Sequence, residues 1–148
     1  TFNDTINYTR CTTDPGSYYV KNYENKKGVG VIKEGQYINS HMLGLHKGLY
    51  LALVQRGQLT LYRDSDKDNQ IDAVITDEGL FGVNIHRANP KIESIQVDKW
   101  SAACVVISNP FKYNTFIQDC KNQILKTKKV FFTLTLVNDL DLKDIEAK

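Results

Sequence analysis

The sequence predicts a mainly β protein, a single-domain β-sandwich or flattened barrel with one α-helix near residues 110–126. Its 148 residues are the size of one ordinary domain with a continuous core. Short apolar runs, separated by Gly, Asn and Asp, recur about every 8–12 residues, which is typical of sandwiches and barrels. Only residues 110–126 place apolar side chains at helical spacing instead.

Strands are expected at short runs that are apolar or that alternate between apolar and polar residues. All but the last precede the helix: 17–20, 29–33, 36–45, 49–56, 58–63, 71–76, 81–87, 95–100, 103–107 and 130–137. The last run shows the alternation most clearly, because Phe132, Leu134 and Leu136 are separated by Thr133 and Thr135. One face of this strand is therefore expected to be apolar and the other polar.

The expected helix has both a start signal and an apolar stripe. Asn109 followed by Pro110 provides an N-cap and a proline at the first helical position. Apolar residues then recur at helical spacing, at Tyr113, Ile117, Cys120 and Ile124. Because Cys120 falls on this stripe, we expect it to be a small core residue.

The chain divides into three parts. Residues 1–16 are polar, end in a Pro15-Gly16 turn, and are expected to form an arm or a short leading strand. Residues 17–137 form the β domain, and residues 138–148 form an acidic tail or a link to a further segment. Because the first residue is Thr1 rather than Met, we expect a processed product or a piece of a longer protein.

Charge and composition exclude several classes of function. Nineteen Lys and Arg against 17 Asp and Glu leave a net charge of +2, with the two signs interleaved. Neither nucleic acid nor an anionic membrane surface is therefore an expected partner. No apolar stretch approaches the roughly 18 residues that a transmembrane helix needs. No Gly-rich phosphate-binding loop is present, and we expect no organic cofactor.

His86 and Cys104 are the strongest candidates for catalysis. In the strand expected at 81–87, alternation puts His86 on the polar face with Gly82 and Asn84, at a strand end that faces a cleft. An imidazole beside a thiol can raise the thiolate fraction and then deliver a proton to a leaving amine, which makes acyl transfer at an amide feasible. The loop before Cys104 could offer backbone N–H groups to the oxyanion. The alternative is an inert buried cysteine.

Two segments, Phe81-Gly82-Val83-Asn84-Ile85-His86 and Ser101-Ala102-Ala103-Cys104, carry a family resemblance. Together they resemble the catalytic core of the L,D-transpeptidases, cysteine enzymes that cross-link peptidoglycan stem peptides. That signature is a Gly- and Ile-rich strand ending in His, a loop, and then Ser-His-Gly-Cys. The resemblance implies a β-sandwich or flattened barrel in which Cys104 is the nucleophile, His86 the general base and Ser101 a supporting loop serine.

The chain departs from this family pattern in the nucleophile loop and just beyond it. Ala102 replaces the loop histidine, and Ala103 replaces the glycine before the nucleophile. Val106 stands where the family carries an arginine, which removes a charged partner for a peptide carboxylate. Either the site works with His86 alone on a different acyl donor, or the domain keeps the fold and has lost the chemistry.

Three nearby residues could compensate as substrate-binding groups. His46 could replace the missing imidazole, and Arg87 could bind a carboxylate in place of the missing arginine. Asn84 shares the strand face of His86 and is the third candidate.

A looser likeness extends over about residues 12–120. The motifs that carry it are Leu45-His46-Lys47-Gly48, Leu61-Tyr62-Arg63-Asp64, Asn84-Ile85-His86-Arg87 and Trp100-Ser101. This combination is similar to uncharacterised proteins of Bacteroidota and their phages. The leading hypothesis is therefore a cell-wall-directed cysteine enzyme, a hydrolase or transpeptidase of peptidoglycan stem peptides. It would act in the cell envelope, as a secreted protein, or in a phage virion, where other virion proteins would be partners. The second hypothesis is an inactive binding or structural module of the same fold.

Residues 64–72 concentrate carboxylates in a short loop. Asp64, Asp66, Asp68 and Asp72 take positions 1, 3, 5 and 9 of a calcium-binding loop, although position 12 is Ile75 rather than Glu. These carboxylates repel one another unless a cation binds, so calcium is the one expected cofactor. The alternative is a solvated hairpin in which Asp and Asn simply favour the turn.

Overall fold

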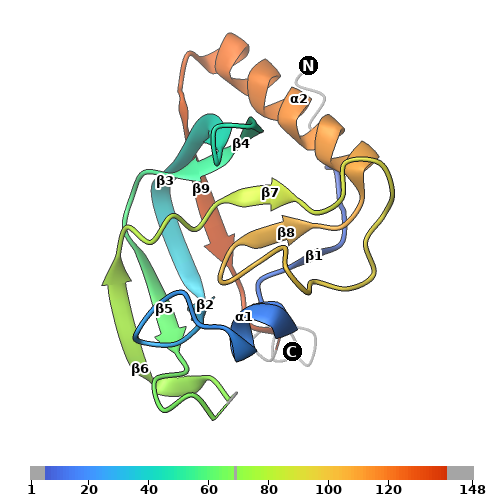
Figure 1. The fold of residues 1–148 in the computed structure, drawn as a ribbon. Helices are drawn as coiled ribbons and strands as arrows, with labels where there is room; N and C mark the ends of the chain where they lie inside the picture. The colour runs from blue at the N-terminus through green and yellow to red at the C-terminus, as the bar shows by residue number, and fades with distance from the viewer. Residues whose placement is uncertain (1–5, 69, 140–148) are drawn as a thin grey trace, which may run out of the picture.

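Two β-sheets and one long helix make up the fold of the computed structural model, which describes residues 6–68 and 70–139 (Figure 1). The larger sheet has the strand order β1 (Cys11–Thr12), β8 (Val105–Ile107), β7 (Ile85–Arg87), β4 (Tyr50–Gln55), β3 (Gly35–His46) and β9 (Phe131–Leu136). The smaller sheet has the order β2 (Gly30–Ile32), β5 (Leu59–Arg63) and β6 (Asp72–Gly79). The helices are α1 (Ser17–Lys21) and α2 (Pro110–Thr127).

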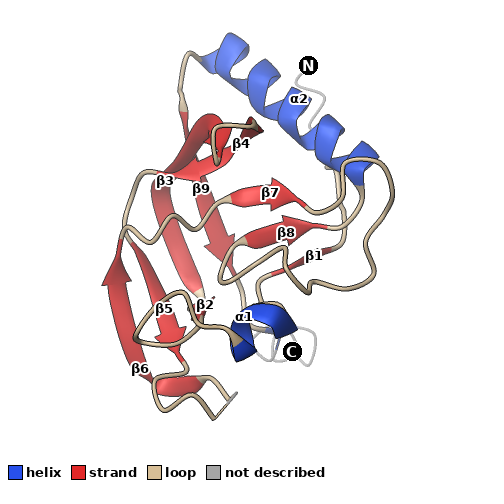
Figure 2. Ribbon diagram, viewed as in Figure 1, coloured by secondary structure: helices blue, strands red, loops and turns tan. Residues whose placement is uncertain are grey.

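The mainly β class expected from the sequence is confirmed. The larger sheet curls into half of a barrel, beside which the smaller sheet lies (Figure 2). Paired strands are antiparallel except β7 and β8, which run parallel. The parallel pair contains His86 and adjoins Cys104, the two residues expected from the sequence to be catalytic.

Ile85 of β7 connects two apolar cores. One core is built around buried residues of both sheets and the loop before β7: Ile32, Leu59, Leu61, Val83 and Val105. The other lies between the larger sheet and α2, around Ile107, Tyr113 and Ile117. Ile85 packs against both clusters, so the position of β7 is held from two directions.

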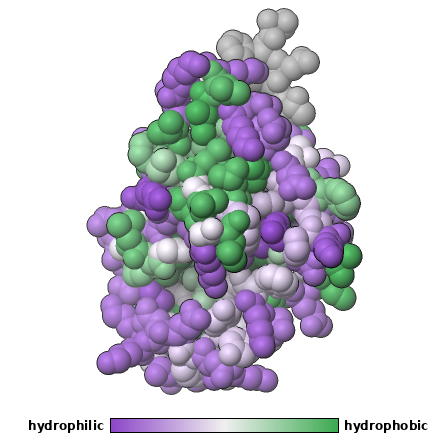
Figure 3. Space-filling model, turned by 45° about the horizontal axis from the view of Figure 1, so that its top comes forward, coloured by the Kyte–Doolittle hydropathy of each residue, from purple (hydrophilic) through white to green (hydrophobic). Residues whose placement is uncertain are grey.

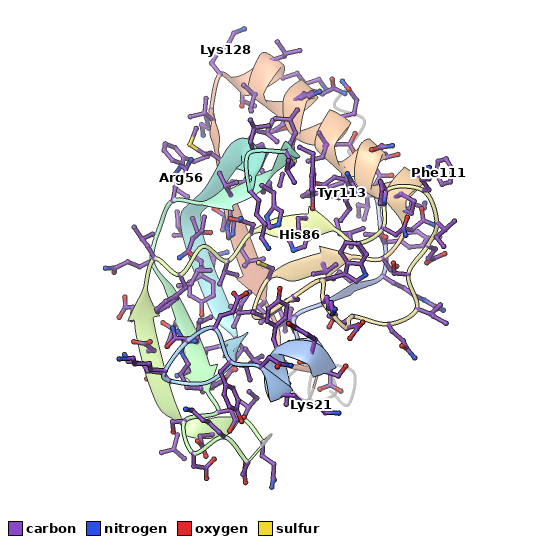
Figure 4. The ribbon with its side chains drawn as sticks, viewed as in Figure 1. Lys21, Arg56, His86, Phe111, Tyr113 and Lys128 are labelled. Atoms are coloured by element: carbon purple, nitrogen blue, oxygen red, sulfur yellow. The ribbon has the colours of Figure 1, made fainter. Side chains whose placement is uncertain are left out.

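Helix α2 forms as the sequence predicts. The Asn109 side chain accepts hydrogen bonds from the N–H groups of Phe111 and Lys112, and Pro110 occupies the first turn. Tyr113 points from the helix toward the sheet (Figure 4) and donates a hydrogen bond to the carbonyl of Leu51. The apolar stripe is buried along Tyr113, Ile117 and Cys120 and half-buried at Ile124. Among the described residues, no helix is long and apolar enough to span a bilayer.

The strand expected at 17–20 is wrong, because these residues form helix α1. Gly16 caps the helix, and its carbonyl accepts hydrogen bonds from the N–H groups of Tyr19 and Val20. Four apolar residues are too few to distinguish a strand from one helical turn, and the preceding Pro15 favours a turn here.

The strand expected at 95–100 is also wrong, because this stretch is a loop. Ile95 is 96% exposed, and the N–H of Trp100 bonds back to the carbonyl of Val97 in a turn. The strand expected at 81–87 is real only from Ile85 onward. Gly82 has a φ of 72°, a left-handed conformation that ends the extended chain.

The amino-terminal segment joins the larger sheet. Cys11 and Thr12 pair with Ile107 and Val106 of β8. Of the two forms expected for residues 1–16, an arm or a short leading strand, the described part therefore contains the strand. The acidic tail was expected at 138–148, and its residues 140–148 lie outside the described part of the chain.

Exposed apolar side chains occur at the β3–β4 hairpin. Leu49 in the turn is 79% exposed, and Leu45 and Leu51 pair across the two strands with exposed side chains. Hydrophobic residues gather in a patch on the face of the molecule seen in Figure 3. The hairpin is also the element that brings His46 toward the candidate site.

Candidate functional site

The register of β7 and β8 puts His86 and Cys104 on one face of the larger sheet. His86 pairs with Val106 in the parallel ladder, and paired residues of parallel strands share a face. Asn84 and Cys104 lie two residues before that pair, so their side chains point to the same side. The face predicted for His86 from strand alternation is therefore shared with the candidate nucleophile.

A cavity of about 220 Å³ opens on this face. The sequence-predicted site residues that line it are Cys104, His86, His46 and Asn84. The remaining lining residues come from α1 and the segment after it, from the β3–β4 turn, from the 81–83 turn and from the loop before β8: Tyr19, Glu24, Lys47, Phe81, Gly82, Val83, Trp100, Ala102 and Ala103.

Cys104 is a free, half-buried thiol on the wall of this cavity. Its Sγ accepts a hydrogen bond from the N–H of Asn84 at 3.4 Å, and its S–H faces the carbonyl oxygen of Gly82 at 3.8 Å. Burial raises the pKa of the thiol, and the Asn84 N–H and the charge of Lys47 only partly oppose this. The resting sulfur is therefore a thiol at neutral pH rather than a thiolate.

His86 is held in the tautomer that a general base needs. Its Nδ1 lies 2.8 Å from the carbonyl oxygen of Arg87, which can only accept, so Nδ1 carries the proton. The hydroxyl of Tyr50 is 3.2 Å from the same nitrogen and also donates to that carbonyl. Nε2 is left with its lone pair, buried and without a hydrogen-bond partner among the described residues.

Burial lowers the pKa of His86, which keeps the ring neutral at pH 7. The backbone carbonyl of Arg87 opposes this shift, whereas the positive charges of Lys47 and Arg87 add to it. The backbone of Trp100 also raises the pKa slightly. A neutral imidazole with a free Nε2 is competent to accept a proton.

His46 lies against His86, with ring centroids 4.1 Å apart and 19° between the planes (Figure 4 shows the position of His86). Asn84 fixes the His46 ring, because its amide nitrogen lies 3.0 Å from His46 Nδ1. The amide oxygen of Asn84 is identified by the hydrogen bond that it accepts from the N–H of Gln55 at 3.0 Å. The amide nitrogen therefore donates, and His46 Nδ1 accepts.

No hydrogen bond joins the Cys104 sulfur to the His86 ring in this structure. The two groups share a cavity and a sheet face, but the thiol is turned toward Gly82. The structure thus places both groups on the wall of one cavity in their neutral forms, without a formed thiolate–imidazolium pair.

Ser101 supports the loop that carries the thiol. It is 2% exposed, and its Oγ donates a hydrogen bond to the carbonyl of Cys104 at 2.8 Å. Its own carbonyl accepts a hydrogen bond from the N–H of Gly16 at 2.7 Å. Ser101 therefore acts on the backbone of Cys104 and is a positioning residue.

Arg87 is not brought to the cavity. Its guanidinium lies over the ring of Tyr50, 4.1 Å from the centroid, and donates a hydrogen bond to the carbonyl of Ala88. Among the candidate substrate-binding residues, the structure places His46 and Asn84 on the cavity wall and leaves Arg87 outside it.

The acidic loop brings three of its four expected ligands together. Ligand oxygens of Asp64, Asp66 and Asp68 lie within 4.8 Å of one another. Asp72 is used differently, because its carboxylate accepts hydrogen bonds from the N–H and the Oγ of Ser65. The cluster lies on the smaller sheet's hairpin, and none of its carboxylates lines the Cys104 cavity.

Gln55 is an important residue that the sequence analysis missed. Its Oε1 accepts hydrogen bonds from the N–H groups of Phe81 and Val83, both at 3.0 Å. Its Nε2 donates to the carbonyls of Gly57 and Gly79. One buried amide therefore holds the segment that forms the cavity wall beside Cys104. A glutamine at the end of the apolar run Tyr50–Gln55 was the available signal.

His41 supports the same segment. It is 1% exposed, and its Nε2 donates a hydrogen bond to the carbonyl of Val83 at 3.0 Å. Its Nδ1 accepts from the Oγ of Ser40 at 2.9 Å. Burial lowers the pKa of His41, so this histidine is a neutral structural residue.

Comparisons with known proteins add no assignment to this geometry. No protein-family model, curated protein or solved structure matches the chain.

Proposed function

We propose that this chain is a cysteine acyl-transfer enzyme that acts on an amide of a cell-wall stem peptide. The observation that carries the proposal is the arrangement of Cys104 and His86. Both line one cavity from the same face of the sheet, and Nε2 of His86 is buried without a hydrogen-bond partner among the described residues. The L,D-transpeptidase resemblance of residues 79–107 supports the choice of a peptidoglycan peptide as substrate.

In the proposed reaction, the side chain of Cys104 turns from Gly82 toward His86. As Sγ attacks the amide carbonyl carbon, the thiol proton passes to His86 Nε2. The C–S bond forms, the C–N bond breaks, and the imidazolium returns the proton to the leaving amine. Water or a second amine then attacks the thioester and releases Cys104, which gives hydrolysis or cross-linking.

The backbone beside the sulfur can stabilise the oxyanion. Among the described residues, neither the N–H of Ala103 nor that of Cys104 donates a hydrogen bond. Two N–H groups that are not used inside the protein are suited to the negative charge that develops on the carbonyl oxygen. Ser101, by holding the Cys104 carbonyl, would keep them oriented.

His46 supports the base by packing against it. A flat, neutral ring on the His86 imidazole restricts its rotation, and Asn84 in turn holds His46. Burial of His86 disfavours its charged form, so the imidazolium readily gives up its proton. We assign His46 and Asn84 as positioning residues of this site.

The test is incubation of the full chain with muropeptides, followed by mass analysis of the products. We expect loss of a terminal residue by hydrolysis or a linked dimer by transfer. Cys104→Ser should abolish product, and His86→Ala should reduce the rate roughly 100-fold or more. Cys11→Ser is the matched control, because Cys11 is an exposed thiol outside the cavity.

The alternative function is an inactive binding or structural module. Ala102 and Ala103 favour it, since they replace two residues of the L,D-transpeptidase loop. Binding of muropeptides without any product, equal in the wild-type and Cys104→Ser proteins, would establish this alternative. In either case, the cell-wall substrate implies that the protein acts in the cell envelope, after secretion, or in a phage virion.

A further inference from the structure

A second cavity adjoins the one that contains Cys104. Its volume is about 370 Å³, and it lies between the segment after α1, strand β5 and the 80–81 turn. The two cavities adjoin, because they share five wall residues: Tyr19, Glu24, Phe81, Ala102 and Ala103.

Arg63, at the end of β5, lines the second cavity and not the first. It is 4% exposed, and its guanidinium lies 4.8 Å from the centroid of the Phe81 ring, which belongs to the shared wall. Gly30 on the paired strand leaves room for this group, because a Cβ at that position would lie 3.1 Å from Arg63 Nη1.

The hydrogen-bonding capacity of Arg63 is only partly used. Nη2 donates to Asp77 at 3.2 Å, whereas Nε is buried and has no acceptor among the described residues. An unfilled N–H on a buried cation costs free energy that an anionic ligand would recover. The protein thus leaves part of the hydrogen-bonding capacity of Arg63 unsatisfied.

Arg63 shares its ion-pair partner with a second cation. Asp77 is shared between Arg63 and Lys27, whose Nζ lies 3.0 Å from the other carboxylate oxygen. Asp77 is therefore not dedicated to Arg63, because a second cation bonds to the same carboxylate. Glu24 lies on the shared wall and would repel an anion there, which favours placing the anion at Arg63 rather than between the cavities.

We propose that the Arg63 cavity binds a carboxylate group of the peptide whose amide is presented to Cys104. The planar guanidinium with a free N–H is the group that recognises carboxylates best. Arg63 is the one arginine among the lining residues of the two cavities, and Arg87 is engaged with Tyr50 instead. This inference rests on the proposed function and adds the requirement that the substrate be acidic.

The experiment compares two probes, N-acetyl-L-alanyl-D-alanine and its carboxy-terminal amide, which differ only in the anionic group. Binding is measured by calorimetry on a Cys104→Ser background, so that failure of the acyl-transfer chemistry leaves the measurement unaffected. We expect the acid to bind roughly tenfold or more tightly than the amide. Arg63→Met should reduce this ratio to about one, and Arg63→Lys should retain part of it. Arg56→Met is the control, because Arg56 is an exposed arginine that lines neither cavity.

A second measurement covers the case in which Arg63→Met does not fold. The ¹⁵N–¹H signal of Arg63 Nε, assigned by its disappearance in Arg63→Lys, should shift when the acid is added and not when the amide is added. Equal binding of acid and amide to the parent protein would overturn the proposal. A preference for the acid that persists in Arg63→Met would also overturn it. So would an Nε signal whose chemical shift does not change when the acid is added.

Discussion

The imidazole rings of His46 and His86 are stacked, with centroids 4.1 Å apart, although the two residues are 40 positions apart in the chain (86 − 46 = 40). Two protonated rings at this distance would repel each other, and both rings are buried. Burial, together with the charges of His86 and Lys47, lowers the pKa of His46 to about 4. The pair is therefore neutral at pH 7, which is the state that the proposed base requires.

This pair predicts a loss of stability in mild acid. The pKa of His46 is lower in the folded protein than in the unfolded chain, where it is near 6.5. Its stabilising contribution is present above pH 6.5 and is lost as the pH falls toward about 4, because only the unfolded chain then binds the proton. The free energy of unfolding, measured in urea at several pH values in this window, should fall by a few kcal/mol, on the order of 3 from His46 alone.

The variant His46→Gln separates this contribution from the others. It should flatten the pH dependence between pH 6.5 and about 4 without removing it, because burial also lowers the pKa values of His86 and His41. Substitution of an exposed residue, such as Lys91→Gln, should leave the wild-type slope unchanged. An identical slope in His46→Gln and wild type would contradict the buried, neutral state of this ring.

The resting thiol of Cys104 should react slowly with alkylating reagents at neutral pH. Burial raises its pKa above the ordinary value of 9.0, so the thiolate that reacts is scarce until the pH is higher. Iodoacetamide labelling of the Cys104 peptide, followed by mass spectrometry, should show a rate that is still rising at pH 9. Lys47→Met should move the profile to still higher pH, because the charge of Lys47 lowers this pKa.

A labelling profile with a midpoint near pH 7 would show instead that His86 stabilises a thiolate in the free protein. In that case the neutral starting state of the proposed mechanism would be wrong, although the assignment of the nucleophile would remain. The buried Cys120, whose pKa burial raises to about 11, is an internal reference for an unreactive thiol.

Gln55→Leu should destabilise the protein strongly. The substitution removes the acceptor for the N–H groups of Phe81 and Val83 and the donor for the carbonyls of Gly57 and Gly79. A buried polar group that loses its partner costs about 1–3 kcal/mol, so a total loss of about 3 kcal/mol or more is expected. Chemical denaturation measures it, and the labelling rate of Cys104 should rise as the cavity wall loosens.

Gln36→Leu is the matched control for this prediction. Gln36 is exposed, and its amide makes one long hydrogen bond, of 3.3 Å, to the Oγ1 of Thr135. Its substitution should change the free energy of unfolding by about 0.5 kcal/mol or less. If both variants were equally stable, the four hydrogen bonds of Gln55 would not be what holds this segment.

Local patterns in the sequence were sufficient for the parts of the site that depend on alternation within one strand. The side of His86 follows from its parity with Asn84, and the burial of Cys120 follows from the helical stripe. The run 17–20 could not be assigned in this way, because one apolar turn fits a strand as well as a helix. Its identity depends on Gly16, whose carbonyl accepts the first hydrogen bonds of α1.

Contacts between distant segments could not be predicted from local patterns. The stacking of His46 on His86 requires that β3, β4 and β7 be neighbours in this order, which no single segment specifies. The hydrogen bonds of Gln55 to the cavity wall also depend on contacts between distant segments, because its partners lie up to 28 residues away in the chain. Arg63 is a candidate only because the fold brings β5 and residues 80–81 to one cavity.

The acidic hairpin gives the last prediction, the binding of calcium. Ligand oxygens of Asp64, Asp66 and Asp68 converge within 4.8 Å, as the positions of a calcium loop require, while Asp72 bonds to Ser65 instead. With fewer carboxylates than the full motif, the affinity should be weak, in the range of about 10⁻⁴–10⁻³ M. Calcium at about 100 times its Kd would add about 2.7 kcal/mol to the free energy of unfolding.

The measurement is the melting temperature in calcium, in magnesium and in chelator. Calcium should raise the Tm of the wild-type protein more than magnesium does, because the larger cation accepts the irregular oxygen geometry of such a loop. Asp66→Asn should remove most of the rise, since it takes a charge from the middle of the cluster. Asp98→Asn, a carboxylate in a separate loop, should leave it intact. A wild-type Tm that does not change in calcium would mean that the aspartates only favour the turn, in which case Asp66→Asn should be neutral or stabilising because it relieves their mutual repulsion.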